Sequence, residues 1–207
     1  MGYPIEEIEK VKAIQLSGYK TDVQVQVTVY LKNAIAAENL SVKLVSNPQG
    51  SNQVDKRWVD HYVEMWDIPQ DIVSILKLFT GETNSQKLGL KDNRKMLLKE
   101  MVKEDQEKII NFFTKNKILV VSDVLKGRGK FSAGWMLVAL VIGENSKWVL
   151  RPINQVMNIF GDGPVAITSR GSLRIGKIGM QRKGGDNGRD SSKMLQFKIN
   201  PVLLFDK

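Results

Sequence analysis

The segment TDVQVQVTVYL, at residues 21–31, decides how the fold of this chain is interpreted. Valine occupies every second position from Val23 to Val29, and polar side chains stand between the valines. Side chains of a strand point alternately to the two faces of a sheet, so this period of two predicts a half-buried β-strand. A second alternating segment follows at 40–45, and its expected buried positions are Leu40, Val42 and Leu44. We therefore expect two neighbouring strands with one apolar and one polar face.

Around these two strands, the sequence predicts a mixture of helices and further strands. Apolar residues at helical spacing predict helices over 5–16, 54–66, 69–79 and 95–115, with Gly18 and Gly81 as stop signals. From Ile118 onward the pattern changes to short strands, at 118–121, 135–142, 148–150, 165–169 and 173–182. The sequence Ser-Arg-Gly-Ser at 169–172 predicts a hairpin turn between the last two strands.

This order of elements predicts an α/β (α+β) fold, in which a mixed sheet is flanked by helices. The 207 residues suffice for one domain or for two small lobes. We expect residues 1–117 to form an α/β lobe with a helical middle, and residues 118–207 to form a basic, β-rich lobe. The two lobes can also belong to one domain, because the boundary near 118 rests on a change of pattern alone.

The composition excludes several classes of site. The chain has no cysteine, so disulfides, zinc-thiolate centres and thiol nucleophiles are excluded. His61 is the single histidine, which argues against a histidine metal cage or a Ser-His-Asp triad. No apolar run approaches the roughly 20 residues that cross a bilayer. We expect a cytoplasmic protein without a membrane partner.

The positive charge of the chain is concentrated near its carboxyl end. The formal net charge is +9, and lysine and arginine greatly outnumber acidic residues over 170–198. Such a surface attracts a polyanion by releasing its counterions. A solvated basic surface without a partner is the plainer interpretation, but glycine and apolar residues interleave with these charges. The pattern favours a nucleic-acid-binding surface.

The two amino-terminal strands also place chemically useful side chains on one face. Asp22 opens the first strand on its polar side, and Ser41 and Lys43 occupy the polar side of the second. If the strands are neighbours, a carboxylate, a hydroxyl and an ammonium group converge. The backbone carbonyl of Val42 offers a further oxygen to a hard cation such as Mg²⁺. This set suits metal-assisted hydrolysis of a phosphodiester, although Asp22 can equally end a turn and Lys43 can be an exposed strand lysine.

Thr21-Asp22 and Ser41-Val42-Lys43 resemble the motif of the PD-(D/E)XK nuclease superfamily, and the likeness extends over residues 5–66. The resemblance implies a type II restriction endonuclease, a site-specific deoxyribonuclease in which Asp22 and the Val42 carbonyl hold Mg²⁺ and Lys43 orients the attacking water. Ser41 stands where the family has a second acid, which puts a two-metal scheme in doubt. Candidates for a substitute carboxylate are Glu6, Glu7 and Glu9.

A second version of the motif can be drawn later in the chain. Asp162 and the triplet Gln181-Arg182-Lys183 have the same offset as Asp22 and the triplet that begins at Ser41. However, Asp162 lies in the turn sequence Gly-Asp-Gly-Pro rather than at the head of an alternating strand. We prefer the amino-terminal site and keep Asp162 with Lys183 as the alternative.

A different role is expected for the glycine-and-charge tract in the carboxyl-terminal half. Arginine, lysine, glutamine, asparagine and aspartate can read base edges, while glycine lets the backbone approach DNA. Lysines outside this tract suit phosphate contacts. The expected DNA-binding residues are Lys126, Arg128, Lys130, Arg170, Gln181, Arg182, Lys183, Asp186, Asn187, Arg189, Lys193 and Lys198. A flexible basic loop that binds nucleic acid without reading its sequence is the alternative.

Together these features predict a sequence-specific, Mg²⁺-dependent endonuclease that hydrolyses double-stranded DNA. A palindromic target would favour a homodimer, and small enzymes of this class also act as monomers. Two rival functions remain open at this point. One is a noncatalytic DNA- or RNA-binding protein, and the other is a base-excising glycosylase, which flips a nucleotide and needs no metal.

Overall fold

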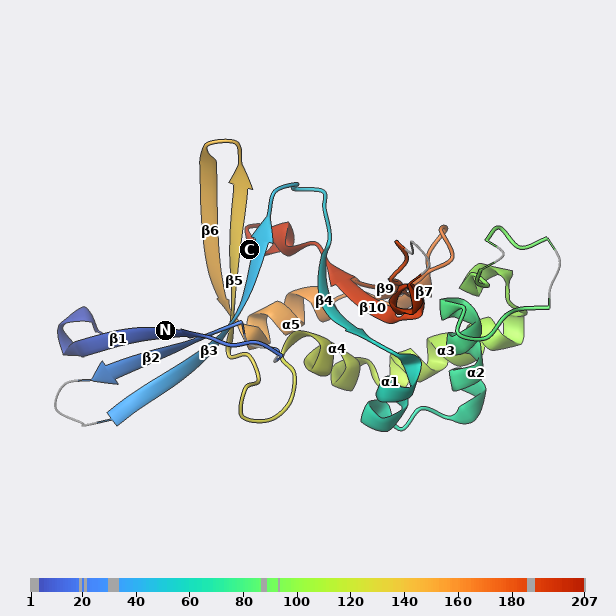
Figure 1. The fold of residues 1–207 in the computed structure, drawn as a ribbon, viewed down its shortest axis with the longest axis horizontal. Coiled ribbons are helices and arrows are strands. Elements are labelled where there is room, and N and C mark those ends of the chain that lie inside the picture. The colour runs from blue at the N-terminus through green and yellow to red at the C-terminus, as the bar shows by residue number, and fades with distance from the viewer. Residues whose placement is uncertain are drawn as a thin grey trace. The chain divides into compact units, whose positions relative to one another are not determined.

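The chain forms two compact units, each assembled from segments that are distant in sequence (Figure 1). In this computed structural model, the described residues are 4–18, 20, 22–29, 34–86, 89–92, 94–185 and 189–206. The first unit consists of Met1–Asn52, Leu125–Ile159 and Asn200–Lys207, and the second of Gln53–Val124 and Phe160–Ile199. The expected boundary near 118 therefore does not separate the two units. The chain crosses between them several times, which a single change of pattern along the sequence cannot reveal.

The first unit is built on a five-stranded mixed sheet. Its strands, in spatial order, are β1 (Ile8–Gln15), β2 (Val23–Val29), β3 (Ala34–Val45), β5 (Trp135–Ile142) and β6 (Asn145–Pro152). The pairing of β3 with β5 is parallel, and the other three pairings are antiparallel. The short helices η1 (Ile5–Glu7) and η4 (Pro201–Leu204) belong to this unit, and α5 (Ile153–Gly161) begins in it.

Strand β3 is long because it pairs with β2 and β5 over different parts of its length. Ala34 to Leu40 lie opposite β2, and Leu40 to Val45 lie opposite β5. Leu40 is the one residue of β3 that has a partner in both neighbours, Val23 and Trp135. Beyond Leu40, no strand among the described residues covers the edge of β3 that faced β2. This is where the candidate site lies.

The buried face of β3 is the reverse of the expected one at its carboxyl end. Leu44 is 67% exposed, whereas Ser41 and Val45 are each 3% exposed. The face that carries Ser41 and Val45 is covered because η4 packs against β3 and β5, with Nε of Arg151 donating to the carbonyl of Leu204 at 3.1 Å. The sequence predicted the alternation. It did not indicate which of the two faces a later segment would cover.

The second unit contains an antiparallel sheet with helices packed on it. The strand order is β4 (Asn52–Arg57), β10 (Leu195–Ile199), β9 (Ile178–Arg182), β8 (Leu173–Ile175) and β7 (Val165–Ile167). The α-helices are α1 (Val59–Trp66), α2 (Gln70–Thr80), α3 (Lys103–Lys115) and α4 (Lys117–Leu125), and the short helices are η2 (Leu98–Glu100) and η3 (Asp190–Lys193). Helix α2 contacts β9 and α3 contacts β7, so these helices cover one face of the sheet.

Aromatic side chains join the helices to the sheet in this unit. Tyr62 and Trp66 of α1 stack at 4.7 Å between ring centroids, and both meet Phe197 of β10 edge-on. Trp66 also contacts Phe113 of α3 edge-on, and all four rings are buried. Burial of an aromatic side chain contributes strongly to stability, so this cluster is the centre of the second core.

Several predicted elements are confirmed. Helix α2 begins after Pro69 and ends at Gly81, whose φ of 78° is the left-handed conformation that stops a helix. Strand β5 spans the predicted residues 135–142. The backbone of 168–172 forms the predicted hairpin turn, in which Gly171 donates to Thr168.

Other predicted elements are wrong. The expected helix over 5–16 is mostly strand β1, because pairing with β2 overrides a weak helical spacing. The expected strand at 118–121 lies in α4, where apolar burial suits a helix equally well. The predicted helix over 54–66 divides into β4 and α1, and the one over 95–115 begins only at Lys103. The predicted strand over 173–182 is a hairpin, β8 and β9.

Within the described residues, no helix is long and apolar enough to span a bilayer.

Candidate active site

Asp22 occupies the point where the pairing of β2 with β3 ends. Its backbone nitrogen donates to the carbonyl of Leu40 at 2.9 Å, as a strand residue would. The Asp22 side chain makes the next hydrogen bond along β3: its Oδ2 accepts from the backbone nitrogen of Val42 at 2.6 Å. The side chain of Asp22 thus replaces the next strand partner of β3 and is held at the open edge of the sheet.

Ser41 and Lys43 lie beside the same carboxylate oxygen. Ser41 donates from Oγ to Oδ2 of Asp22 at 3.4 Å, and Nζ of Lys43 lies 3.6 Å from that oxygen. The Asp22 side chain is 47% exposed and that of Lys43 is 15% exposed. The expected meeting of a carboxylate, a hydroxyl and an ammonium group is therefore present, although Ser41 and Lys43 lie on the covered face and not on the wet face that the sequence suggested.

The Val42 carbonyl faces the same open edge of β3. Within a strand, the N–H and C=O groups of one residue point to the same side, and those of the next residue point to the other side. Because the Val42 nitrogen donates toward Asp22, its carbonyl also points to that side. Further along this edge, Asn52 donates from Nδ2 to the carbonyl of Leu44 at 2.9 Å. The Val42 carbonyl lies between these two bonded positions.

The site has the donor set for one hard cation. Mg²⁺ is commonly held by one or two carboxylates, together with waters and oxygens of a substrate phosphate. Asp22 and the Val42 carbonyl supply two oxygens, and the hydroxyl of Ser41 is adjacent. In the part of the chain that the structure describes, no group of three or more His, Asp or Glu side chains could hold a metal ion. The side chain of Glu7 lies outside the described residues.

A basic loop lies next to this site in the first unit. Asn39 of β3 donates from Nδ2 to the carbonyls of Lys130 and Ser132, both at 3.0 Å, and accepts from Gln24 at 3.0 Å. Gly134 donates to the Asn39 carbonyl at 2.8 Å. The loop carries three predicted phosphate-binding residues: Lys126, which is half-buried, and Arg128 and Lys130, which are exposed. The role of Asn39 was missed, because a single asparagine in a strand gives no signal of what it will hold.

The alternative site is not assembled. Asp162 forms an ion pair with Lys177 at 3.1 Å, in the turn region before β7. Along the sheet, Val165, Ile175 and Ile178 lie side by side at one end, whereas Lys183 follows the opposite end of β9. Asp162 and Lys183 therefore flank opposite ends of these strands, and a shared cation is excluded by their separation.

The predicted base-reading tract is more ordered than expected. Part of it forms β9, η3 and β10. Arg182 is only 7% exposed and donates to Ser192 at 3.2 Å, so its expected position in an exposed reading loop is wrong. The cause is the alternation of β9, which turns this arginine into the unit while Gln181 points the other way. Arg170 and Arg189 are exposed, and Gln181, Lys183, Lys193 and Lys198 are partly exposed. Asp186 and Asn187 lie outside the described residues.

Comparison with known proteins finds a matching family model and similar solved structures. The family model described as R.HinP1I restriction endonuclease matches residues 1–205. Among solved structures, the chain is similar to restriction endonuclease MspI in a crystal structure with its cognate DNA, with a TM-score of 0.66 and 13% sequence identity. That similarity covers 94% of this chain and 72% of the other. No match was found among curated proteins. The mixed α/β fold is thus that of a restriction endonuclease.

Proposed function

Because this chain belongs to the R.HinP1I restriction endonuclease family, we propose that it hydrolyses both strands of duplex DNA at a specific sequence, with Mg²⁺ at the Asp22 site. Membership of the family makes the chain a nuclease that acts on DNA. The observation that supports the finer proposal is the shared contact of Ser41, Val42 and Lys43 with one carboxylate oxygen of Asp22. The type II class, the metal and the double-strand cut are parts of this proposal.

Each residue of the site has a distinct role in the proposed reaction. Asp22 and the Val42 carbonyl would hold the cation, and the backbone bond from Val42 fixes the orientation of the carboxylate. Lys43 follows Val42 in β3. From there its ammonium group can orient water and balance negative charge that develops on the phosphate. When bound, Mg²⁺ would act as a Lewis acid and lower the pKa of a water molecule.

Among the described residues, Asp22 is the one acid in contact with Ser41, Val42 and Lys43, which favours a one-cation scheme. The family motif carries an acid where this chain has Ser41, and the Ser41 hydroxyl is a donor to Asp22 rather than a second charge. One carboxylate leaves coordination positions for water and for an oxygen of the scissile phosphate. We therefore propose one Mg²⁺ per active site.

Binding of DNA is assigned to basic side chains of both units. Arg128 and Lys130 lie on the loop beside the active site, where they suit contacts with the backbone near the cut. In the second unit, Gln181, Lys183 and Arg189 retain exposed surface and are the described candidates for reading bases. A palindromic target would be cut by a homodimer, which places one copy of the Asp22 site on each strand.

The proposal is tested by incubating the purified chain with a plasmid in Mg²⁺ or in EDTA and then mapping the ends. Discrete fragments that appear only with Mg²⁺ support it. A plasmid that is shifted but intact points to a noncatalytic binder, and abasic sites formed in EDTA point to a glycosylase. Either of these two outcomes overturns the proposal.

Two lysine variants then locate the site. Lys43→Ala should abolish cleavage while DNA binding persists, because the ammonium group acts on the reaction and not on the bulk of the interface. Lys183→Ala removes the lysine of the alternative motif. Because Lys183 is a candidate for reading bases, this variant should bind its target more weakly but still cleave the DNA that it binds. Loss of cleavage in Lys183→Ala with full cleavage in Lys43→Ala would refute the assignment of the Asp22 site.

A further inference from the structure

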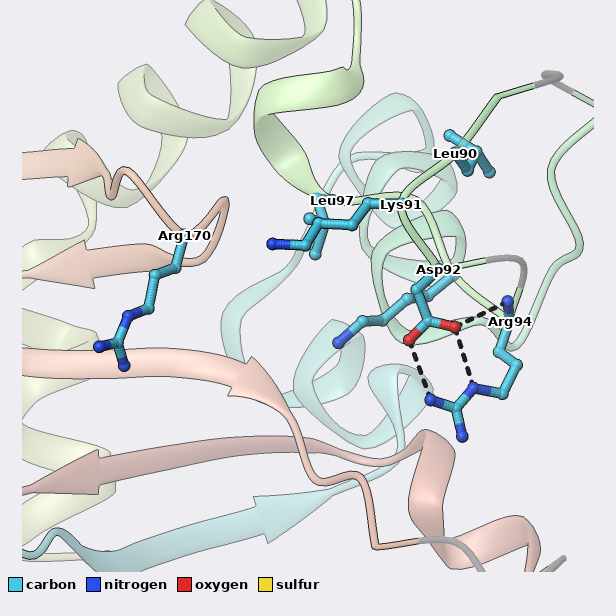
Figure 2. Close-up of a pocket in the computed structure, with 7 residues that line it drawn as sticks. Leu90, Lys91, Asp92, Arg94, Leu97 and Arg170 are labelled. Carbon is cyan, nitrogen blue, oxygen red and sulfur yellow. Dashed lines mark hydrogen bonds and ion pairs between the residues drawn. The ribbon is translucent and has the colours of Figure 1, made fainter.

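A cationic pocket in the second unit is not used by the proposed chemistry (Figure 2). It lies between the segment that precedes α3 and the turn between β7 and β8. Its lining residues are Leu90, Lys91, Asp92, Arg94, Lys95, Leu97 and Arg170. Four of these seven side chains are basic and one is acidic, so the pocket carries an excess of positive charge. Of the four, only Arg170 was predicted to bind DNA; the other three lie within the short charged segment 91–95, which was not assigned a role.

Hydrogen bonds anchor the lining segment at Lys91, Leu97 and Leu98. Both carboxylate oxygens of Glu100 accept from backbone nitrogens, those of Lys91 at 2.9 Å and Leu97 at 2.8 Å. Leu98 donates to the carbonyl of Gly171 at 3.0 Å, which fixes the segment to the turn that carries Arg170. A pocket whose walls are fixed in this way loses little conformational entropy when a ligand binds.

The one acid of the pocket is already engaged. Asp92 accepts from Nε of Arg94 at 2.9 Å and from its terminal nitrogen at 3.2 Å, as the dashed lines in Figure 2 show. This hydrogen bonding holds the pKa of Asp92 below its usual value. The Asp92 carboxylate is therefore hydrogen-bonded to Arg94, and one acid cannot neutralise all four cations of the pocket.

Lys95 is the partly buried cation of the pocket. Burial lowers the pKa of its ammonium group; Arg182 and Arg94 add to that shift, and the charges of Asp92 and Glu100 oppose it. The buried guanidinium of Arg182 thus acts on the pocket electrostatically. An anion that entered the pocket would stabilise the charged form of Lys95 and relieve the repulsion among these cations.

We propose that this pocket, through the cations of Lys91, Lys95 and Arg170, binds a backbone phosphate of duplex DNA. The inference rests on the proposed function, because DNA is the substrate there. The pocket is open, and none of its described lining residues is aromatic, so it offers no surface on which a free nucleotide base could stack. A phosphate of a long polymer, presented at the surface, fits it better. The contact would position the duplex without reading its sequence.

The test is a salt titration of DNA binding in EDTA, so that no cleavage occurs. A labelled duplex is bound to wild type and to the double variant Lys91→Ala/Arg170→Ala, whose side chains are both exposed. Loss of one phosphate contact should reduce the slope of log affinity against log salt by about 0.9. The matched control is Lys108→Ala/Lys115→Ala, which removes the same charge from another pocket of this unit, where Asp67 and Asp71 offset the lysines.

The outcomes separate the two proposals. A smaller slope and weaker binding in the double variant, with the slope of the control unchanged, support the phosphate site. Equal slopes in the double variant and the control overturn this inference but leave the proposed function intact. If wild type itself shows no salt-sensitive binding to DNA, both fail. Circular dichroism of each variant confirms that a lower affinity does not reflect unfolding.

Discussion

The carboxylate of Asp22 accepts a hydrogen bond from the backbone nitrogen of Val42 at 2.6 Å, where the pairing of β2 with β3 has just ended. The same carboxylate therefore makes the last hydrogen bond between the β2 side and β3, and it also lies at the candidate cation position. Only one of its oxygens, Oδ2, takes part in the contacts found among the described residues. Oδ1 lies on the remaining side of the carboxylate and is the oxygen that a cation would use.

The first prediction separates these two roles. Asp22→Asn keeps an oxygen that can accept from Val42 but removes the negative charge. We expect folding to be preserved and cleavage of plasmid DNA in Mg²⁺ to fall by at least about a hundredfold, because a metal contributes several kcal/mol to the transition state. The control is Ser41→Ala, which removes only the long 3.4 Å contact and should retain cleavage within about tenfold. Full cleavage in Asp22→Asn would contradict the role given to this carboxylate.

A second prediction concerns the anchor of the basic loop. Asn39→Ala removes two hydrogen bonds to the carbonyls of Lys130 and Ser132. We expect KM for DNA to rise and kcat to change little, because the loop would contact the backbone without touching the reacting atoms. Steady-state cleavage of a short duplex measures both constants.

Asn200→Ala is the matched control for Asn39→Ala. It removes two side-chain bonds in the same unit, the one from Asn200 to the carbonyl of Pro48 at 3.0 Å and the one that Asn200 accepts from the backbone nitrogen of Val202 at 3.1 Å. KM should then stay near the wild-type value. A rise in KM of equal size in both variants would show that general loosening of the unit, and not the position of the basic loop, is responsible.

The elements that the sequence predicted well are those with an unambiguous local signal. Strict alternation predicted β2, and Pro69 with Gly81 predicted the limits of α2. The expected approach of Asp22 to Lys43 was also found, because it required only that two adjacent strands pair. Local patterns suffice when the partner of an element is its neighbour in sequence.

The remaining features depend on segments that are distant in sequence. Leu44 is exposed and Ser41 is buried because η4, more than 150 residues later, covers that face of β3. Arg182 is buried on its face of β9 and donates to the buried Ser192 of η3, a segment that was not predicted to return to this strand. Likewise, the cationic pocket joins Arg170 to a segment near Lys91. Such pairings are decided by tertiary packing, which the local period cannot report.

A third prediction concerns the glycine that ends α2. A Cβ at Gly81 would lie 2.0 Å from the carbonyl oxygen of Arg94, and the φ of Gly81 is 78°. Gly81→Ala should therefore cost about 3 kcal/mol, because left-handed strain adds to a clash with backbone. Gly143→Ala carries the strain of a φ of 59° without a contact within 4 Å, so it should cost only about 1 kcal/mol. Urea unfolding measures both values.

Gly81→Ala also tests the cationic pocket, because the clash displaces the segment that carries Arg94. At a temperature where the variant remains folded, its affinity for DNA should fall along with its stability. The Gly143→Ala control should bind DNA as wild type does. Equal stability of the two glycine variants would contradict the close approach of Gly81 to Arg94.

The last prediction concerns a buried hydrogen bond between Tyr62 and Asp55. The Tyr62 hydroxyl donates to Oδ1 of Asp55 at 2.7 Å, and both side chains are buried. Tyr62→Phe removes the hydroxyl that donates to Asp55. At pH 8 it should lower the free energy of unfolding by about 2 kcal/mol. Burial, followed by the charge of Asp55, raises the pKa of Tyr62 above its usual value of 10.0.

The pH dependence of this cost follows from the direction of the Tyr62 pKa shift. Because the pKa is higher in the folded state, the contribution of the tyrosine is complete below pH 10.0 and is lost as the pH rises above that value. The stability difference between wild type and Tyr62→Phe should therefore shrink between about pH 9 and 11. Val59→Ala, in the same helix, removes buried volume without a titrating group, so its deficit should stay constant over this range. A Tyr62→Phe deficit that also stays constant would show that the tyrosine ionises as readily in the folded chain as in the unfolded one, and would contradict the raised pKa of Tyr62.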